Sequence, residues 1–249
     1  MTAGNVVCTD HFGAIASWDP AAPDSYRGIP IHSSRGLHEF AAAELGRLGL
    51  VRQGASVLDL GPRAGAMAQR LGDSGMLVTA AGLRPAEFLA RGPSVRHVTA
   101  DADGPFEAAV PAPVDLVVAV DTIGMVENPN AFLRSCFACL LPGGSLLLTA
   151  ANADSSGAAV SFLMHGTFAR LPGNPEACLH VPPVHRAHLL AAADRAGFRT
   201  VSEAGFGAGP SPPGSGPVAG LLLKVARASR RADPSRDAGI LVCVFRRPA

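Results

Sequence analysis

Apolar residues fall into two kinds of segment that take turns along most of the chain. Short continuous apolar runs predict β-strands at 56–60, 76–81, 95–99, 114–120, 145–150, 198–203 and 240–245. Between them, apolar residues recur at the three- and four-residue spacing of a helix. These patterns predict helices at 37–48, 67–71, 85–91, 129–141, 186–196 and 218–231, with Ser33 and Ser34 as candidate N-caps of the first.

This alternation of strands and helices predicts one α/β domain with a doubly wound, mostly parallel sheet. The run at 114–120 is almost wholly apolar after Asp115, as expected for a strand with both faces buried. Ligands of such sheets bind at the carboxyl ends of the strands, near the point where the strand order reverses. We therefore look for function in the loops that follow Leu60, Ala81, Thr99 and Val120.

Three segments depart from the alternation and define the expected domain organisation. Residues 1–33 show no clear period and are interpreted as an N-terminal cap on a domain spanning 34–249. Residues from about 151 to 185 are rich in Gly, Pro, Asn and His, and we expect them to form a lid over the carboxyl edge of the sheet. The Gly/Pro/Ser-rich stretch at about 205–217 predicts a flexible linker.

Composition narrows the class of protein. The 249 residues carry a formal net charge of only +1, which argues against electrostatic nucleic-acid binding. No apolar run reaches the length of about 20 residues that a bilayer requires, and no signal peptide is found, so a cytoplasmic protein is expected. Cys136 and Cys139 lie within an apolar helix without a second Cys/His pair, and no metal site is predicted.

The loop after the first strand is the clearest candidate ligand site. It runs Asp59-Leu60-Gly61-Pro62-Arg63-Ala64-Gly65 and leads directly into a predicted helix. Glycines permit positive φ and a close approach of ligand to backbone, and a helix N-terminus favours an anionic group. By itself such a loop is as often structural as functional.

Several other segments of the chain follow in a characteristic order and make the interpretation of this loop more specific. They are Val57-Leu58-Asp59-Leu60-Gly61 with Gly65, Pro113-Val114-Asp115-Leu116-Val117-Val118, Val126-Glu127-Asn128-Pro129, Leu141-Pro142-Gly143-Gly144-Ser145, and His180-Val181-Pro182-Pro183 before Ala196-Gly197-Phe198. Over residues 34–204 this series resembles the class I S-adenosylmethionine (SAM) dependent methyltransferases, in their small-molecule branch. The order of the segments is far more specific than any one of them.

The resemblance implies a Rossmann-like sheet of seven mostly parallel strands with the last strand antiparallel, and SAM as cofactor. Asp59 and the backbone around Gly61 and Gly65 would hold the methionine end of SAM, and Arg63 of the same loop is a further cofactor-binding candidate. Asp101 and Ala102 would lie beside the adenine, and Val120 and Asp121 beneath the sulfonium.

Three positions depart from the family pattern. Arg63 replaces the middle glycine of the loop, where positive φ costs a non-glycine residue about 1 kcal/mol or more. Gly82 stands where an acidic residue usually binds both ribose hydroxyls, a loss of roughly 2–3 kcal/mol in binding. Gly124-Met125 replaces the Glu-His of many relatives. Together these changes predict weakened, altered or lost SAM binding.

Histidines are the candidate general bases, because methyl transfer to oxygen or nitrogen often needs one. His180 is favoured and then His165, since both lie in the expected lid. His11, Trp18 and Tyr26 of the N-terminal segment are candidates for contacting substrate, although Trp18 and Tyr26 could equally fill the edge of the core.

Several functions remain open from the residues alone. The leading hypothesis is a methyltransferase acting on a small molecule in specialised metabolism, with a homodimer or partner enzyme as possible assemblies. A second is an enzyme that catalyses a cyclisation or elimination, with or without a spectator SAM. A third is a non-catalytic homologue that stabilises a partner. A nicotinamide enzyme is the weakest rival, because the dinucleotide fingerprint is missing.

Overall fold

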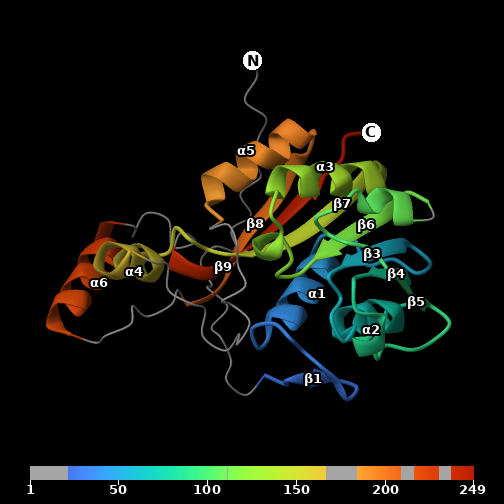
Figure 1. The fold of residues 1–249 in the computed structure, drawn as a ribbon, viewed down its shortest axis with the longest axis horizontal. Helices are drawn as coiled ribbons and strands as arrows, with labels where there is room; N and C mark the ends of the chain where they lie inside the picture. The colour runs from blue at the N-terminus through green and yellow to red at the C-terminus, as the bar shows by residue number, and fades with distance from the viewer. Residues whose placement is uncertain (1–21, 111, 167–183, 209–215, 230–236) are drawn as a thin grey trace.

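A computed structural model of the chain describes residues 22–110, 112–166, 184–208, 216–229 and 237–249 (Figure 1). A small hairpin, β1 (Ser25–Tyr26) and β2 (Ile29–Pro30), precedes the main domain. Seven strands form the sheet: β3 (Ser56–Leu60), β4 (Leu77–Ala81), β5 (Val95–Val98), β6 (Val114–Ala119), β7 (Leu140–Ala151), β8 (Arg199–Ala208) and β9 (Ala238–Arg246).

The strand order is β5-β4-β3-β6-β7-β9-β8. All neighbours from β5 to β7 pair in parallel, whereas β9 is antiparallel to both β7 and β8. The prediction of a mostly parallel seven-stranded sheet with its last strand antiparallel is therefore confirmed. The order reverses between β3 and β6, and this switch point is where a doubly wound sheet opens a crevice for ligands.

Helices cover both faces of the sheet (Figure 1). On one face, α1 (Leu37–Arg47) and α2 (Ala66–Asp73) bury their apolar sides in a core with β3, β4 and β6. On the other, α3 (Pro129–Cys139) and α5 (Arg186–Ala196) bury theirs in a second core, which takes in Cys136 and Cys139. Burial on both sides explains why the strands read as continuous apolar runs rather than alternating ones.

Two further helices stand away from the body of the sheet. Figure 1 shows α4 (Ser156–His165) and α6 (Pro217–Ser229) side by side beyond the carboxyl end of β7. α4 lies within the segment expected to form a lid. None of the helices in the described part of the chain is both long and apolar enough to cross a bilayer.

The boundaries of two predicted helices need correction. The N-cap of α1 is Gly36, with a φ of 79°, rather than Ser33 or Ser34. Glycine adopts that left-handed conformation without strain, so the chain turns into the helix there. The helix predicted at 85–91 is only the single turn η2 (Pro85–Glu87), because Phe88 and the residues after it are not helical.

Two predicted strands are longer than their apolar cores. β7 begins at Leu140, where it pairs with Val114, and Pro142-Gly143-Gly144 forms an irregularity in the strand rather than a separate loop. β8 continues to Ala208 because its residues pair with β9, as in the pair Phe206 and Ile240. Residues 205–208 therefore belong to a strand, not to the expected linker.

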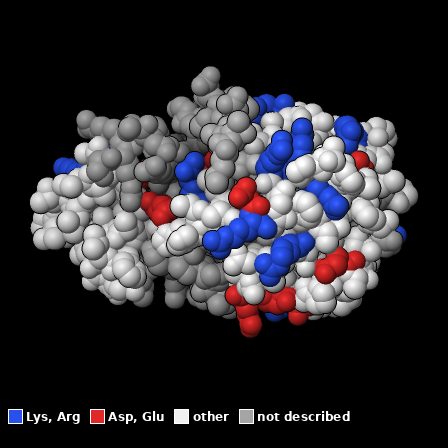
Figure 2. All heavy atoms as spheres, turned by 90° about the horizontal axis from the view of Figure 1, so that it is seen from above, with Lys and Arg blue, Asp and Glu red and all other residues white. Residues whose placement is uncertain are grey.

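Several surface charges form ion pairs. Examples are Arg27–Asp73 at 2.9 Å, Arg84–Glu87 at 3.1 Å and Arg52–Asp115 at 3.3 Å. Figure 2 shows basic and acidic side chains intermixed on the face seen from above. Exposed pairs of this kind contribute about 0–1 kcal/mol each. The charges with the largest energetic consequences are those buried at the switch point of the sheet.

Candidate active site

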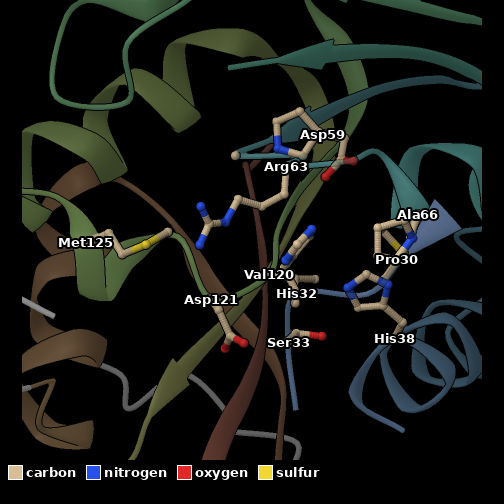
Figure 3. A pocket seen from close by; sticks show the side chains of 13 residues that line it. Pro30, His32, Ser33, His38, Asp59, Arg63, Ala66, Val120, Asp121 and Met125 are labelled. Atoms are coloured by element: carbon tan, nitrogen blue, oxygen red, sulfur yellow. The ribbon is translucent and has the colours of Figure 1, made fainter. Parts of the chain in front are cut away.

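Two adjoining cavities open at the carboxyl ends of the central strands. The inner cavity lies between the loop after β3, the loop after β6 and residues 30–38 (Figure 3). The outer cavity extends from the same loops to the ends of β4 and β5. Gly61, Pro62, Arg63 and Met125 border both cavities. The inner cavity has a volume of about 30 Å³ and the outer one about 240 Å³.

Tight packing fixes the loop between β3 and α2. Gly61 has a φ of 69°, and a Cβ there would lie 2.8 Å from the Thr122 hydroxyl oxygen. That hydroxyl donates to the Leu60 carbonyl across the two strand ends. Gly65, the N-cap of α2, has a φ of 94°, and its Cβ would lie 2.6 Å from the Phe88 ring. Both glycines are therefore required by the fold.

Asp59 places a buried carboxyl beside the inner cavity. Its exposed fraction is 2%, and Oδ2 has no hydrogen-bond partner among the residues described. Burial raises the pKa of Asp59 to about 7, although a hydrogen bond from the Ala68 amide in the first turn of α2 favours the charged form. A buried acid with an unpartnered oxygen is costly, and a cationic ligand group would remove that cost.

Asp121 brings a second buried carboxyl to the same cavity. Its backbone amide donates to the Thr149 hydroxyl at 2.8 Å, and that hydroxyl donates back to Oδ1 at 3.1 Å. Burial raises the pKa of Asp121 to about 6. Its φ of 54° is left-handed, a strained conformation for a non-glycine residue.

Arg63 adds a cation to the inner cavity. Its φ of 51° makes it, like Asp121, one of three non-glycine residues with positive φ in the described chain; the third is Arg27. Burial, and then the neighbouring Arg84 charge, lower the pKa of Arg63, and Glu87 opposes the shift. Two of the three strained residues thus carry opposite charges into one cavity, and strain of this kind concentrates at functional sites.

Residues 30–38 supply a polar wall that sequence reasoning missed. Pro30, His32, Ser33 and His38 line the inner cavity (Figure 3). His38 is 8% exposed, and its Nδ1 has no hydrogen-bond partner among the described residues. Burial, with the Arg70 and His32 charges, lowers the pKa of His38 to about 3, so the ring is neutral at physiological pH. One feature of the sequence could have identified His38: it lies three residues before Ala41, on the buried side of α1.

The outer cavity is more exposed and its polar groups are already paired locally. Asp101 Oδ1 accepts from the Asp103 amide at 3.0 Å, and Arg84 pairs with Glu87. Burial lowers the pKa of His97, whose ring lies tilted against that of Phe88 with the ring centroids 4.9 Å apart. A Cβ on Gly82 would lie 3.0 Å from Pro62 Cδ, so the proline ring limits the space for any side chain at position 82.

The cofactor residues expected from sequence mostly gather at these cavities. The inner cavity is lined by Asp59, Gly61, Arg63, Val120 and Asp121. The outer cavity is lined by Asp101 and Ala102, together with Gly61 and Arg63. Gly65 lies behind the loop as the α2 N-cap. Their roles in binding remain predictions.

Of the expected catalytic and substrate residues, the two that the structure describes, His165 and Tyr26, do not line either cavity. His165 is exposed at the end of α4 and lines neither of them. Tyr26 donates to Asp73 at 3.0 Å and lies under the Arg70 guanidinium. His11, Trp18 and His180 fall outside the described residues. No group of three or more potential metal ligands occurs within the described ranges.

Comparisons with known proteins find similar sequences. A family model described as a methyltransferase domain matches residues 34–203. A "Ubiquinone biosynthesis O-methyltransferase" of Xanthomonas axonopodis pv. citri is 27% identical over 179 residues, covering 65% of this chain and 68% of the relative. The enzyme of that name from Xanthomonas euvesicatoria pv. vesicatoria is 28% identical over 172 residues, with the same coverage of the two chains.

Solved structures share the fold. A SAM-dependent methyltransferase from Archaeoglobus fulgidus superposes with a TM-score of 0.59 at 16% identity, over 84% of this chain and 94% of that one. The [4+2]-cyclase SpnF superposes with a TM-score of 0.56 at 16% identity, over 92% of this chain and 87% of that one. One architecture therefore serves both a methyltransferase and a cyclase, so the fold alone does not distinguish these activities and the residues of the site must be considered.

Proposed function

The chain belongs to the methyltransferase-domain family, and from this premise we propose that it transfers a methyl group from SAM to a small molecule. SAM is the cofactor of the class I methyltransferases to which the family assigns the chain. The observation that carries the proposal is the buried Asp59 carboxyl at the switch point of the sheet, whose Oδ2 has no hydrogen-bond partner among the described residues. An acid so placed suits the ammonium group at the amino-acid end of the cofactor.

The residues present fit SAM in their chemistry. Asp59 would bind the ammonium group, and the outer cavity of about 240 Å³ would receive the nucleoside beside Asp101 and Ala102. The ribose is the weak point of the fit, since Gly82 offers no carboxylate to its hydroxyls. We therefore expect recognition to depend more on the amino-acid end than on the ribose.

SAM supplies an activated methyl group carried on a sulfonium. The chain would contribute alignment and exclusion of water, which are the main sources of rate in such a transfer. Asp121 is the described group best suited to accept a proton from a hydroxyl substrate. Its pKa of about 6 leaves the carboxylate ionised at neutral pH, and Thr149 holds Oδ1 in place.

Hydroxyl groups are the first acceptors to test. The curated relatives are named O-methyltransferases, and their partial identity favours the same accepting atom here. A role in specialised metabolism follows only from the resemblance of the sequence to the small-molecule branch.

A labelling experiment tests the proposal. The protein is incubated with methyl-labelled SAM and a panel of phenols, catechols and aliphatic alcohols, and products are identified by mass spectrometry. We expect label in at least one hydroxyl compound, with turnover lowered about 100-fold or more in Asp121→Asn. Absence of label from every acceptor, in protein shown to bind SAM, would overturn the assignment of methyl transfer.

A second function, catalysis without methyl transfer, is favoured by two features of the site. Gly82 supplies no acid to the ribose, and the Pro62 ring limits the space for a side chain there. Met125 stands where many relatives carry His, so the site lacks two groups typical of methyl transfer, the ribose-binding acid and the histidine. The shared fold of SpnF makes a cyclisation the leading form of this alternative. Rearranged product without incorporated label in the same assay would establish it.

A further inference from the structure

Arg63 occupies a position where a side chain is unexpected. It lies in the tight loop between β3 and α2, and it borders both cavities. Figure 3 shows its side chain crossing the inner cavity, with the guanidinium directed toward the side where Met125 and Asp121 lie. The arginine therefore stands at the junction between the space for a nucleoside and the space enclosed by the two acids.

The placement of Arg63 has a measurable energetic cost. A left-handed φ of 51° costs a non-glycine residue about 1 kcal/mol or more. The guanidinium also loses solvent and faces the charge of Arg84. The matched position Arg27 has a φ of 50°, but its guanidinium is largely exposed and pairs with Asp73 at 2.9 Å. Of these two strained arginines, only Arg63 is partly buried and lines a cavity.

The charges of the inner cavity complement a zwitterion. The unpartnered Asp59 oxygen suits an ammonium, whereas a guanidinium suits a carboxylate, which it can bind through two parallel hydrogen bonds. An amino-acid group carries both charges on one carbon. A cavity that presents an acid and an arginine together is therefore suited to that group.

We propose that Arg63 is a positioning residue that binds the α-carboxylate at the amino-acid end of SAM, opposite the ammonium site at Asp59. This inference rests on the proposed function. The inner cavity, at about 30 Å³, is too small for an amino-acid group while the arginine crosses it. The side chain must turn aside as the ligand enters, and the carboxylate then holds it in its new position.

Calorimetry with two ligands separates this role from a purely structural one. S-adenosylhomocysteine carries the amino-acid end, and 5′-methylthioadenosine is a nucleoside thioether that lacks it. In Arg63→Gly we expect the Kd of S-adenosylhomocysteine to rise about 10- to 100-fold, while that of 5′-methylthioadenosine changes less than about twofold. Arg63→Lys should recover part of the loss, because a lysine keeps the charge without the bidentate geometry.

Arg27→Gly is the matched control, since it removes an arginine with the same backbone strain outside the cavities. It should leave both affinities unchanged. If Arg63→Gly binds S-adenosylhomocysteine as well as or better than wild type, the arginine only obstructs the site and the inference fails. The inference also fails if wild-type protein binds 5′-methylthioadenosine but not S-adenosylhomocysteine. Wild-type protein that binds neither ligand contradicts the proposed function itself.

Discussion

The inner and outer cavities adjoin each other but are built on different principles. Three polar groups of the inner cavity are buried at an energetic cost: Asp59, Asp121 and His38 are each at most 8% exposed, and their pKa values are shifted by burial. Polar groups of the outer cavity are more exposed and satisfied by their neighbours, as in the pair of Arg84 and Glu87.

This difference indicates how binding energy is divided along the ligand. Desolvated charges give strong and specific contacts, whereas exposed, paired charges give little. The inner cavity should therefore recognise charge at the amino-acid end, and the outer cavity should recognise mainly the shape of the nucleoside. Substitutions at matched positions of the two regions can sharpen or break this contrast.

The largest expected effect is on the pH dependence of stability. The pKa of Asp59 is raised, so between about pH 4 and about pH 7 the folded state holds a proton that the unfolded state has lost. Asp59 therefore destabilises the fold increasingly as the pH rises through this window. Asp59→Asn should gain stability relative to wild type over the same range, by up to about 4 kcal/mol.

Urea unfolding at a series of pH values measures this gain. The lowered pKa of His38 acts oppositely, since its contribution to stability is lost as the pH falls below about 6.5. The difference between variant and wild type, rather than either curve alone, is thus the quantity to follow. Asp101→Asn is the matched control, because it removes an exposed carboxyl from the outer cavity. An equal gain in both variants would contradict the contrast between the cavities.

A smaller effect is expected from filling the tight loop. Gly61→Ala adds a Cβ 2.8 Å from the Thr122 hydroxyl oxygen, whereas Gly54→Ala adds one in open space at a similar φ of 74°. Each substitution should lower the free energy of unfolding by about 1 kcal/mol because of the positive φ. Gly61→Ala should lower it by roughly 1–2 kcal/mol more because of the contact with Thr122. Thermal unfolding of the two variants gives the difference. Equal losses of stability in the two variants would show that the loop moves enough to accommodate the added Cβ.

The smallest effect concerns the ribose. Gly82→Ala reports the cost of crowding Pro62, and Gly82→Asp adds a carboxylate to the same Cβ. The aspartate variant should bind S-adenosylhomocysteine about 10-fold more tightly than the alanine variant, because the acid can accept from the ribose hydroxyls. If calorimetry finds the two equally weak, the end of β4 does not face the ribose.

Much of the architecture could be predicted because burial on both faces leaves a direct mark on the sequence. The strand at 56–60 and the helix at 186–196 were predicted to the residue. Strand ends were predicted less well, since β7 and β8 are extended by pairing with neighbours distant in sequence. No local pattern records such pairing.

The site was only partly predictable, for a similar reason. The loop residues from Asp59 to Gly65 could be identified because they are contiguous and follow a strand. His38 was missed because it joins the cavity only when α1 packs beside the loop. A Cβ at Gly82 would lie against the Pro62 ring, which belongs to a separate loop. The sequence therefore shows position 82 only as the loss of an acid and does not show the proline ring that limits the space there.

A calorimetric titration with S-adenosylhomocysteine near pH 7, repeated in two buffers of different ionisation enthalpy, tests the central claim most directly. An ammonium group that binds the Asp59 carboxylate should displace its proton, on the order of half a proton per site at a pKa of about 7. We expect binding with proton release in wild type, and about 100-fold weaker binding without release in Asp59→Asn. No heat at millimolar ligand, or equal affinity and no proton release in both proteins, would contradict the account.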